Sequence, residues 1–301
     1  MKVTVSGATG TIGQALVGEL RERGDEVIAL SRNAERAAAT LGVEAQAWTD
    51  PQDEPPPLDS LRGSDAVAHL LGETVAQRWT EEAKREIRDS RVLSTRRLVA
   101  ALAELSPQER PRVLVSQSAA GFYGPRGDER LSEEAAGGDD FLANVVRAWE
   151  AEAQSAAGLG MRVVLTRTGV VLSEGGGALD KMLPFFKLGV GGPVAGGRQY
   201  VPWVHLDDVV GALVACLDGE LSGPVNVTAP EPVTNRELSR TLGKVLKRPA
   251  FAPVPGLAVK ALYGEMAMIV TTGQRVVPTR LEQSCYRFRR PSLEAALRAT
   301  I

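Results

Sequence analysis

Residues 2–13 read KVTVSGATGTIG, and the rest of the chain is organised around them. The first four residues form a short alternating apolar run that predicts a buried strand, and residues 15–20 then take the apolar spacing of a helix. In such a unit Gly7 permits a tight turn, Gly10 lets the backbone approach a pyrophosphate, and Gly13 lets helix and strand pack closely. The helix N-terminus adds unpaired N–H groups and a positive dipole end. The stretch therefore predicts a dinucleotide site contacted by Gly7, Thr9, Gly10, Thr11, Ile12 and Gly13, the alternative being a glycine turn that binds nothing.

The end of the second predicted strand indicates which dinucleotide is bound. Residues 26–30 form this strand and Ser31-Arg32-Asn33 follow it. NAD-binding chains usually place Asp or Glu near this point to bind the ribose 2′-hydroxyl. No acid stands at this strand end, whereas the Arg32 guanidinium can fork onto a 2′-phosphate, with Ser31 and Asn33 adding neutral hydrogen bonds. The sequence therefore favours NADP(H) over NAD(H), the alternative for Arg32 being an exposed side chain on a solvated loop.

Composition excludes several other function classes. The chain has 301 residues, 44% apolar and 24% charged, with a formal net charge of −2. This balance supplies no basic face for nucleic acid or for a membrane surface, and no apolar run approaches the ~18 residues of a membrane helix. A strand that starts at residue 2 predicts no signal peptide, and two cysteines, Cys216 and Cys285, suit a reducing cytoplasm. We expect a cytoplasmic monomer or homodimer without a metal site, since the only histidines are His69 and His205.

Strands and helices alternate along the first two-thirds of the chain. Further strands are predicted at 65–72, 112–116 and 161–166, with helices at 80–105 and 141–157 between them. This order predicts an α/β fold, a Rossmann-type doubly wound parallel sheet whose ligands bind at the carboxyl ends of the strands. From those ends we expect cofactor contacts from Leu70, Leu71, Gly72, Glu73, Ser116, Arg167 and Gly169. The predicted domains are 1–248, with substrate-side insertions at about 170–203 and 225–248, and a smaller C-terminal helical module at 249–301.

Together these residues resemble the extended short-chain dehydrogenase/reductase superfamily, and more narrowly an atypical group called "epimerase family protein". The marks of the narrower group are Gly72-Glu73 with Arg78-Trp79, the helix from Phe141-Leu142-Ala143 to Trp149-Glu150, and Gly273-Gln274-Arg275 near the end. The resemblance implies a domain like that of NAD-dependent epimerases and dehydratases, followed by a C-terminal module of unknown function. It covers nearly the whole chain.

The superfamily resemblance also implies a tyrosine and a lysine four residues apart, with a serine that binds the reacting oxygen. The predicted helix from Phe141 to Glu150 has neither tyrosine nor lysine. We therefore expect Ser118, or Ser116, in the serine role and Tyr123 as proton donor. For Tyr123 the alternative is a ring packed beside the nucleotide.

Other polar residues have weaker assignments. Arg78, Lys84, Arg88 and Arg91 follow the third strand and could contact an anionic substrate, against the alternative of ordinary helix charges. The glycine-rich segments 175–177 and 189–197 are predicted to be mobile, the second of them as a lid. Asp207 and Asp208 are expected to cap the following helix.

The resemblance thus implies an NADP(H)-binding atypical short-chain dehydrogenase/reductase, an oxidoreductase or epimerase-like enzyme on a small carbonyl or hydroxylated substrate that can be anionic. The alternative is a catalytically silent NADP(H)-sensing regulatory or scaffold protein. The missing tyrosine and lysine leave the choice between these two open at the level of sequence.

Overall fold

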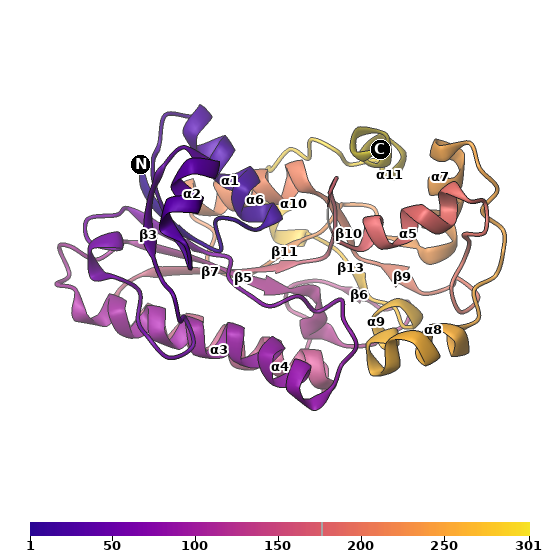
Figure 1. Cartoon of the computed structure of the whole chain (residues 1–301), viewed down its shortest axis with the longest axis horizontal. Helices are drawn as coiled ribbons and strands as arrows, with labels where there is room; N and C mark the ends of the chain where they lie inside the picture. Colours follow the sequence, from indigo (N-terminus) through magenta and orange to yellow (C-terminus); the bar gives the residue numbers. More distant parts are fainter. Residues whose placement is uncertain (176) are drawn as a thin grey trace.

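The centre of the molecule is a parallel sheet (Figure 1). It has seven strands in the order β11-β7-β5-β4-β1-β2-β3. The structure, a computed structural model, describes residues 1–175 and 177–301, so the middle of the predicted 175–177 loop lies outside the described residues. The strands of this sheet are β1 (Lys2–Ser6), β2 (Glu26–Ser31), β3 (Glu44–Ala47), β4 (Ala66–His69), β5 (Val113–Ala119), β7 (Arg162–Thr168) and β11 (Gly223–Val227). The predicted Rossmann-type fold is confirmed.

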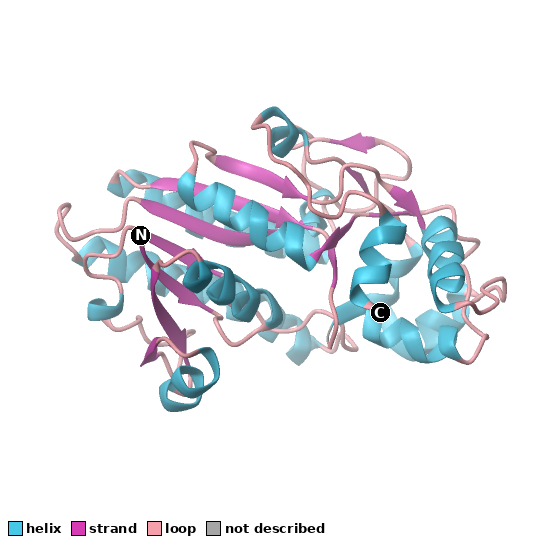
Figure 2. Ribbon diagram, turned by 90° about the horizontal axis from the view of Figure 1, so that it is seen from above, coloured by secondary structure: helices cyan, strands magenta, loops and turns pink. Residues whose placement is uncertain are grey.

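Helices cover both faces of the sheet, as Figures 1 and 2 show. One face packs on α1 (Thr11–Glu22), α2 (Ala34–Leu41) and α6 (Leu206–Asp218), and the other on α3 (Glu81–Glu104) and α4 (Phe141–Gln154). Strands buried on both faces read as near-continuous apolar runs. The central strand β1 shows this, because Val3 and Val5 are fully buried between β2 and β4. The strand order reverses beside β1, where doubly wound sheets open their ligand crevice.

The rest of the chain builds a smaller body beyond the carboxyl ends of the strands. Its strand pairs are β8 (Val170–Leu172) with β10 (Trp203–His205), β9 (Tyr200–Val201) with β12 (Val233–Thr234), and β6 (Arg130–Leu131) with β13 (Arg275–Val276). Its helices are α5 (Gly177–Lys187), α7 (Asn235–Leu246), α8 (Gly256–Tyr263), α9 (Met268–Thr271) and α11 (Leu293–Thr300), while α10 (Thr279–Gln283) packs against β11. Short 3₁₀ turns are η1 (Leu58–Ser60), η2 (Ala120–Tyr123), η3 (Ser155–Leu159) and η4 (Gly264–Ala267). A separate apolar core centred on Trp203 joins α5, α7 and α11.

Helix α6 begins at Leu206, before the two acids expected to cap it. The His205 ring caps it by accepting the backbone N–H of Asp207 at 3.1 Å. The buried Asp208 carboxylate instead accepts backbone N–H groups of residues 289 and 290, at 2.6 and 2.9 Å. The prediction that Asp208 caps the helix is wrong, since it ties the C-terminal segment to α6. Among the described residues no helix is long and apolar enough to cross a bilayer.

Candidate nucleotide and substrate site

The glycine turn between β1 and α1 has the geometry that the sequence predicts. Gly7 has a φ of +67°, and a Cβ there would lie 2.8 Å from the carbonyl carbon of Leu70. A Cβ on Gly13 would clash with the Gly7 carbonyl oxygen and lie 2.7 Å from the Cα of Ala8. A Cβ on Gly10 would meet only the Gly7 oxygen, at 3.4 Å. Gly7 and Gly13 are therefore required by packing, whereas Gly10 faces space into which a ligand fits.

The N-terminus of α1 adds the electrostatic part of this site. Gly10 is the N-cap residue, no side chain caps the helix, and its first turn contains no acid. Thr9, Gly10 and Thr11 are exposed. Helix N–H groups left without a capping side chain, at the positive end of the dipole, bind phosphate oxygens well. The residues present therefore fit a dinucleotide diphosphate.

Arg32 stands at the same edge of the sheet as this turn. Strands β1 and β2 are neighbours, with Ser6 opposite Leu30, so the chain leaves both strands side by side. Arg32 is exposed there. Asn33 also has a structural role, because its side-chain oxygen caps α2 by accepting the N–H of Arg36 at 2.9 Å. Arg32 is thus the cation that follows β2 directly on this edge.

The end of β4 is braced by the partly buried Arg91. Arg91 donates to the carbonyl oxygens of Ile87 and Glu73 at 2.9 and 2.8 Å, and its guanidinium lies 5.4 Å from the Trp149 ring centroid. A Cβ on Gly72 would lie 3.0 Å from that guanidinium carbon. Burial lowers the Arg91 pKa to about 10. Arg91 therefore holds residues 72–73 in place.

The other three basic residues predicted to contact an anion have separate settings. Lys84 pairs with Glu265 at 2.7 Å, and Arg88 pairs with the neighbouring Asp89 at 2.6 Å. Arg78 is exposed, beside Gly264. These settings favour the alternative of ordinary helix charges, and a contact of these residues with an anionic substrate stays a prediction.

His69, the last residue of β4, is a buried neutral ring. Its Nδ1 lies 2.6 Å from the Ser6 hydroxyl and its Nε2 lies 3.0 Å from the Thr95 hydroxyl. Thr95 donates its own proton to the carbonyl of Arg91, so the Nε2–H tautomer fits both contacts. Burial lowers the His69 pKa to about 4. His69 therefore has a structural role, because its ring joins β4 to β1 and α3.

Ser118 and Tyr123 belong to a buried chain of polar contacts. The Ser118 hydroxyl donates to Glu150 at 2.6 Å, and both Glu150 oxygens accept from Arg167 at 2.8 Å. Arg167 also donates to the Tyr123 hydroxyl at 3.1 Å, and that hydroxyl donates to Asn226 at 2.7 Å. This chain of five residues, here called the Ser118–Asn226 network, joins β5, α4, β7, η2 and β11.

The network includes both residues expected to be catalytic, Ser118 and Tyr123, and its contacts engage both hydroxyls. Tyr123 is fully buried, and burial raises the pKa of its phenol, with Arg167 opposing that shift. A proton donor needs contact with the substrate and a lowered pKa. Ser118 is 1% exposed and its proton is committed to Glu150. The structure favours the alternative for Tyr123, a packed ring.

Three further residues that the sequence predicts to contact the cofactor pack against other parts of the protein. Arg167 is 4% exposed inside the network, with its guanidinium 3.4 Å from the Phe122 ring centroid. Ser116 is fully buried, and its hydroxyl donates to the carbonyl of residue 117 at 3.3 Å. A Cβ on Gly169 would clash with the Pro202 carbonyl oxygen. Close packing of β7 against the approach to β10 explains this glycine.

Sequence reasoning missed the partners that complete the network. Asn226 is a fully buried amide in β11, and Glu150 is a largely buried carboxylate on the sheet-facing side of α4. Glu133 accepts the backbone N–H groups of both Asn226 and Arg280, each at 3.1 Å. The sequence did contain a sign of these partners, because both are polar residues at positions where the strand or helix pattern places a buried side chain. A buried polar side chain needs a hydrogen-bond partner.

The 189–197 loop is anchored to its neighbours. Val194 forms a β-bridge with Val254, whose N–H donates to the Pro193 carbonyl at 2.9 Å. The N–H of Val194 donates to the Asn235 side chain at the start of α7, at 2.8 Å. These contacts hold the loop against α7 and the segment around Val254, and its role as a lid stays a prediction.

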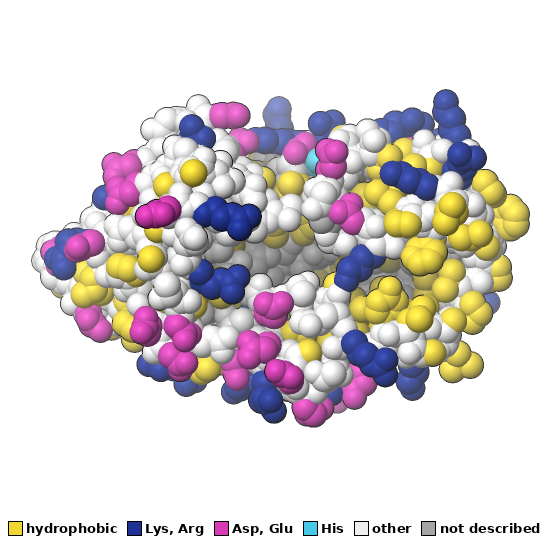
Figure 3. All heavy atoms as spheres, in the orientation of Figure 1, with side chains coloured by type: hydrophobic (Ala, Val, Ile, Leu, Met, Phe, Trp, Pro, Cys, Tyr) yellow, Lys and Arg dark blue, Asp and Glu magenta, His cyan; other side chains and the backbone are white. Residues whose placement is uncertain are grey.

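The open space lies between the two bodies. Figure 3 shows a hollow at the centre of the face seen in Figure 1, between the half that carries α1 and α2 and the half that carries α5 and α8. Lys181 of α5 donates a hydrogen bond to the carbonyl of Ala76 in the loop after β4. This contact links the smaller body to the loop that follows the central sheet. The hollow lies where the strands end, which is where such sheets bind ligands.

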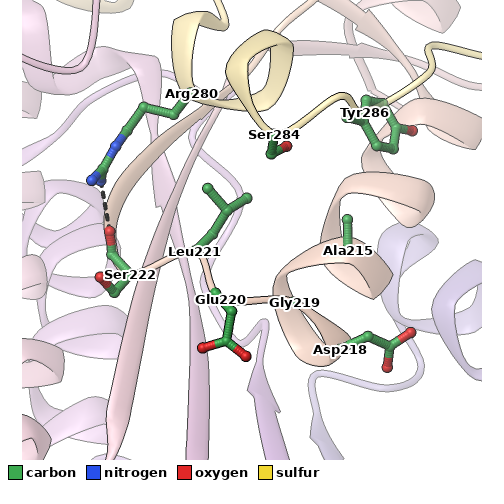
Figure 4. Close-up of a pocket in the computed structure, with 9 residues that line it drawn as sticks. All are labelled: Ala215, Asp218, Gly219, Glu220, Leu221, Ser222, Arg280, Ser284 and Tyr286. Carbon is green, nitrogen blue, oxygen red and sulfur yellow. Dashed lines mark hydrogen bonds between the residues drawn. The ribbon is translucent and has the colours of Figure 1, made fainter.

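A second cavity, of about 620 Å³, lies at the opposite edge of the sheet. Figure 4 shows it between the end of α6, the start of β11 and the 280–286 segment, with Arg280 donating to the Ser222 carbonyl at 2.6 Å. Because residues 218–222 lead into the amino end of β11, this cavity is remote from the glycine turn.

Comparison with known proteins agrees with this geometry. The NAD dependent epimerase/dehydratase family matches residues 3–228, and a domain of unknown function, DUF1731, matches residues 254–300. The chain is 39% identical over 300 residues to the epimerase family protein SDR39U1 homolog of Arabidopsis thaliana, covering 99% of this chain and 86% of the relative. It is 38% identical to epimerase family protein SDR39U1 of Mus musculus, with 100% of both chains covered.

Solved structures give the same result. Human epimerase family protein SDR39U1 (isoform 2), crystallised with NADPH, has a TM-score of 0.88 at 35% identity and covers 100% of this chain and 99% of that chain. A UDP-glucuronic acid 4-epimerase of Bacillus cereus, solved with UDP-glucuronic acid and NAD, has a TM-score of 0.79 at 16% identity over 100% of this chain and 98% of that chain, a likeness of fold alone. The resemblance predicted from the sequence is confirmed, and the chain belongs to the NAD dependent epimerase/dehydratase family, within the extended short-chain dehydrogenase/reductases.

Proposed function

We propose that this protein binds NADP(H) in the glycine turn and acts as an oxidoreductase or epimerase-like enzyme on a small carbonyl or hydroxylated substrate. The observation that carries the proposal is the uncapped N-terminus of α1, with Gly10 facing open space and Arg32 exposed on the neighbouring strand end. A relative that matches the whole chain at 35% identity was crystallised with NADPH, which supports the same cofactor here.

The glycine turn and Arg32 bind different parts of the cofactor. Backbone N–H groups from Gly10 to Gly13 hold the diphosphate, and the Arg32 guanidinium binds the 2′-phosphate. When bound, the nicotinamide supplies a site that gives or accepts hydride. The substrate occupies the central hollow, bordered by the exposed residues 72–74 and by the η2 turn.

We assign Ser118 and Tyr123 a positioning role in this site. Their hydroxyls fix η2 and the end of β7 through Glu150 and Arg167, so the wall of the hollow keeps one geometry. Neither hydroxyl reaches the hollow without breaking a buried hydrogen bond.

The alternative function is a protein that binds NADP(H) and performs no turnover. A specific observation favours it. Helix α4 carries no tyrosine or lysine, and the two hydroxyls expected to replace them are buried and engaged. A sensor needs only the nucleotide site and a surface that changes when the site fills.

Two measurements separate these outcomes. Calorimetry with NADPH and NADH tests binding, and we expect NADPH to bind more tightly. Nicotinamide absorbance is then followed with bound NADPH against aldehydes and ketones and with bound NADP⁺ against alcohols and sugar nucleotides, and a change with any of them, or formation of an epimer, supports an enzyme. Tight NADPH binding with no such reaction across the panel supports the silent alternative. Absence of heat with both nucleotides contradicts the whole proposal.

A further inference from the structure

Large apolar side chains are exposed at the end of the molecule that carries α5 and α8. We call them the α5–α8 surface, and they are exposed by between 55% and 82%: Phe185, Leu188, Val190, Phe251, Leu257 and Leu262. Figure 3 shows a broad apolar area over this end of the molecule. Proteins expose single apolar residues routinely, but a group of them on one area marks a surface that binds something.

The segments that carry these side chains run side by side. Val194 forms a parallel β-bridge with Val254. Five residues earlier in each segment, Gly189 packs against Pro249, since a Cβ on Gly189 would lie 3.3 Å from that ring. The two segments are therefore paired, and α8 begins directly after them. The apolar residues that end α5 and those of α8 thus belong to one continuous area.

Helix α8 presents its apolar face outward. At about 100° per residue, Leu257, Ala258 and Ala261 lie on one side of the helix and Val259 lies on the other. Val259 is 8% exposed, whereas Leu257 is 82% exposed. A helix on the surface of a globular protein normally has the opposite arrangement, with its polar face toward water. An outward apolar face is typical of a helix that lies in the interface of a bilayer.

The charges around this surface have one sign. Residues 181–200 and 244–262 contain no Asp or Glu. Their basic residues are all exposed: Lys181, Lys187, Arg198, Lys244, Lys247, Arg248 and Lys260. Lys244 pairs with Glu294, and among the described residues the others have no carboxylate partner. The net charge of −2, from which no basic face is expected, therefore hides a basic end of the molecule.

These features select one kind of occupant. A symmetric contact with a second copy would bring two sets of these cations together, which is repulsive. The side chains of Leu188 and Leu257 are 77% and 82% exposed, so they protrude, whereas the apolar anchors of protein interfaces fit into pockets. An anionic lipid surface accepts protruding apolar side chains and attracts the cations beside them.

We propose that the α5–α8 surface docks on an anionic lipid bilayer, with α8 lying in the plane of the interface. Leu188 and Leu257 enter the boundary between headgroups and acyl chains, and Lys187 and Lys260 bind lipid phosphates beside them. Helix α1 lies at the other end of the molecule, so the glycine turn stays open to nucleotide in the docked state (Figure 1).

The test is sedimentation of the full chain with vesicles of phosphatidylcholine alone and of phosphatidylcholine mixed equally with phosphatidylglycerol. We expect binding to the anionic vesicles only, and weaker binding in high salt because the attraction is screened. Leu188→Gln/Leu257→Gln should weaken binding about 100-fold, about tenfold for each apolar side chain that no longer leaves water. Lys187→Gln/Lys260→Gln should weaken it about 25-fold, about fivefold for each cation.

A matched control removes two exposed cations from the other half of the molecule. Arg36→Gln/Arg97→Gln, on α2 and α3, should leave vesicle binding unchanged. Thermal unfolding checks that each variant is folded, and NADPH calorimetry tests the glycine turn separately.

Three results overturn the proposal. The first is no sedimentation with either vesicle, and the second is equal sedimentation with neutral and anionic vesicles. The third is equal binding by wild type and Leu188→Gln/Leu257→Gln. Sedimentation velocity without lipid completes the test, because a wild-type dimer that the leucine variant abolishes would assign the surface to a second copy instead.

Discussion

Glu150 and Arg167 face each other as a bidentate ion pair inside the protein, with Arg167 Nε and Nη2 each 2.8 Å from a different carboxylate oxygen. The pair joins α4 to β7, and its side chains are only 10% and 5% exposed. A charge in this setting is tolerable only while its partner is present, because water no longer solvates it.

Removal of one partner should therefore be costly. We expect Glu150→Gln to lower the free energy of unfolding by about 3 kcal/mol, since it leaves Arg167 buried without a counter-charge. Urea denaturation measures the change. Glu152→Gln, two residues along α4, breaks only the exposed pair with Arg96 and should cost about 0–1 kcal/mol. Equal effects of the two variants would show that the buried pair contributes no special stability.

Two glycines of α1 give a matched test of the nucleotide turn. Gly13→Ala places a Cβ against the Gly7 carbonyl, so we expect it to displace the turn and abolish NADPH binding in calorimetry. Gly18 lies in the same helix, and a Cβ at this position would have no neighbouring atom within 4 Å. Gly18→Ala should therefore stabilise the protein by about 0.5–1 kcal/mol and leave binding intact. Normal binding by Gly13→Ala would contradict the assigned site.

Arg32 decides between the two nucleotides in our proposal. We expect Arg32→Ala to weaken NADPH by about 1–3 kcal/mol, the size of a charge-assisted contact, with NADH nearly unchanged. Arg36→Ala, an exposed change in the first turn of α2, serves as the control in the same titration. An equal loss for NADPH and NADH in Arg32→Ala would show that the guanidinium does not contact the 2′-phosphate.

Buried His69 predicts a pH dependence of stability. Its pKa is about 4 in the folded protein and about 6.5 when unfolded, so between these values the unfolded chain binds more protons. Stability should fall by about 3 kcal/mol as the pH drops through that window and should be fully present above it. His69→Gln should remove this part of the slope in urea denaturation. An unchanged slope in the variant would place the titration elsewhere.

The elements that are determined by residues close together in the sequence could be predicted. The strand–turn–helix unit at residues 2–22 is local, and the spacing of Thr234 from Glu237 predicts the cap of α7. Both depend on residues a few positions apart, where periodicity and capping preferences decide the outcome.

The buried polar contacts could not be predicted, because their members come from distant segments. Tyr123 meets Asn226 across 103 residues, and the acceptor of the 289–290 backbone is Asp208, 81 residues earlier. A single sequence shows that these residues are polar, and only the fold shows which of them meet. For this reason the sequence predicts Tyr123 at the substrate, whereas its side chain lies inside the protein.

One carboxylate oxygen of Glu133 accepts hydrogen bonds from the backbone N–H groups of both Asn226 and Arg280, each at 3.1 Å. A strand of the central sheet and the first turn of a C-terminal helix thus share a single acceptor. Replacing Glu133 by Ala should therefore raise the hydrogen–deuterium exchange rates of both amides, because the two lose the same acceptor.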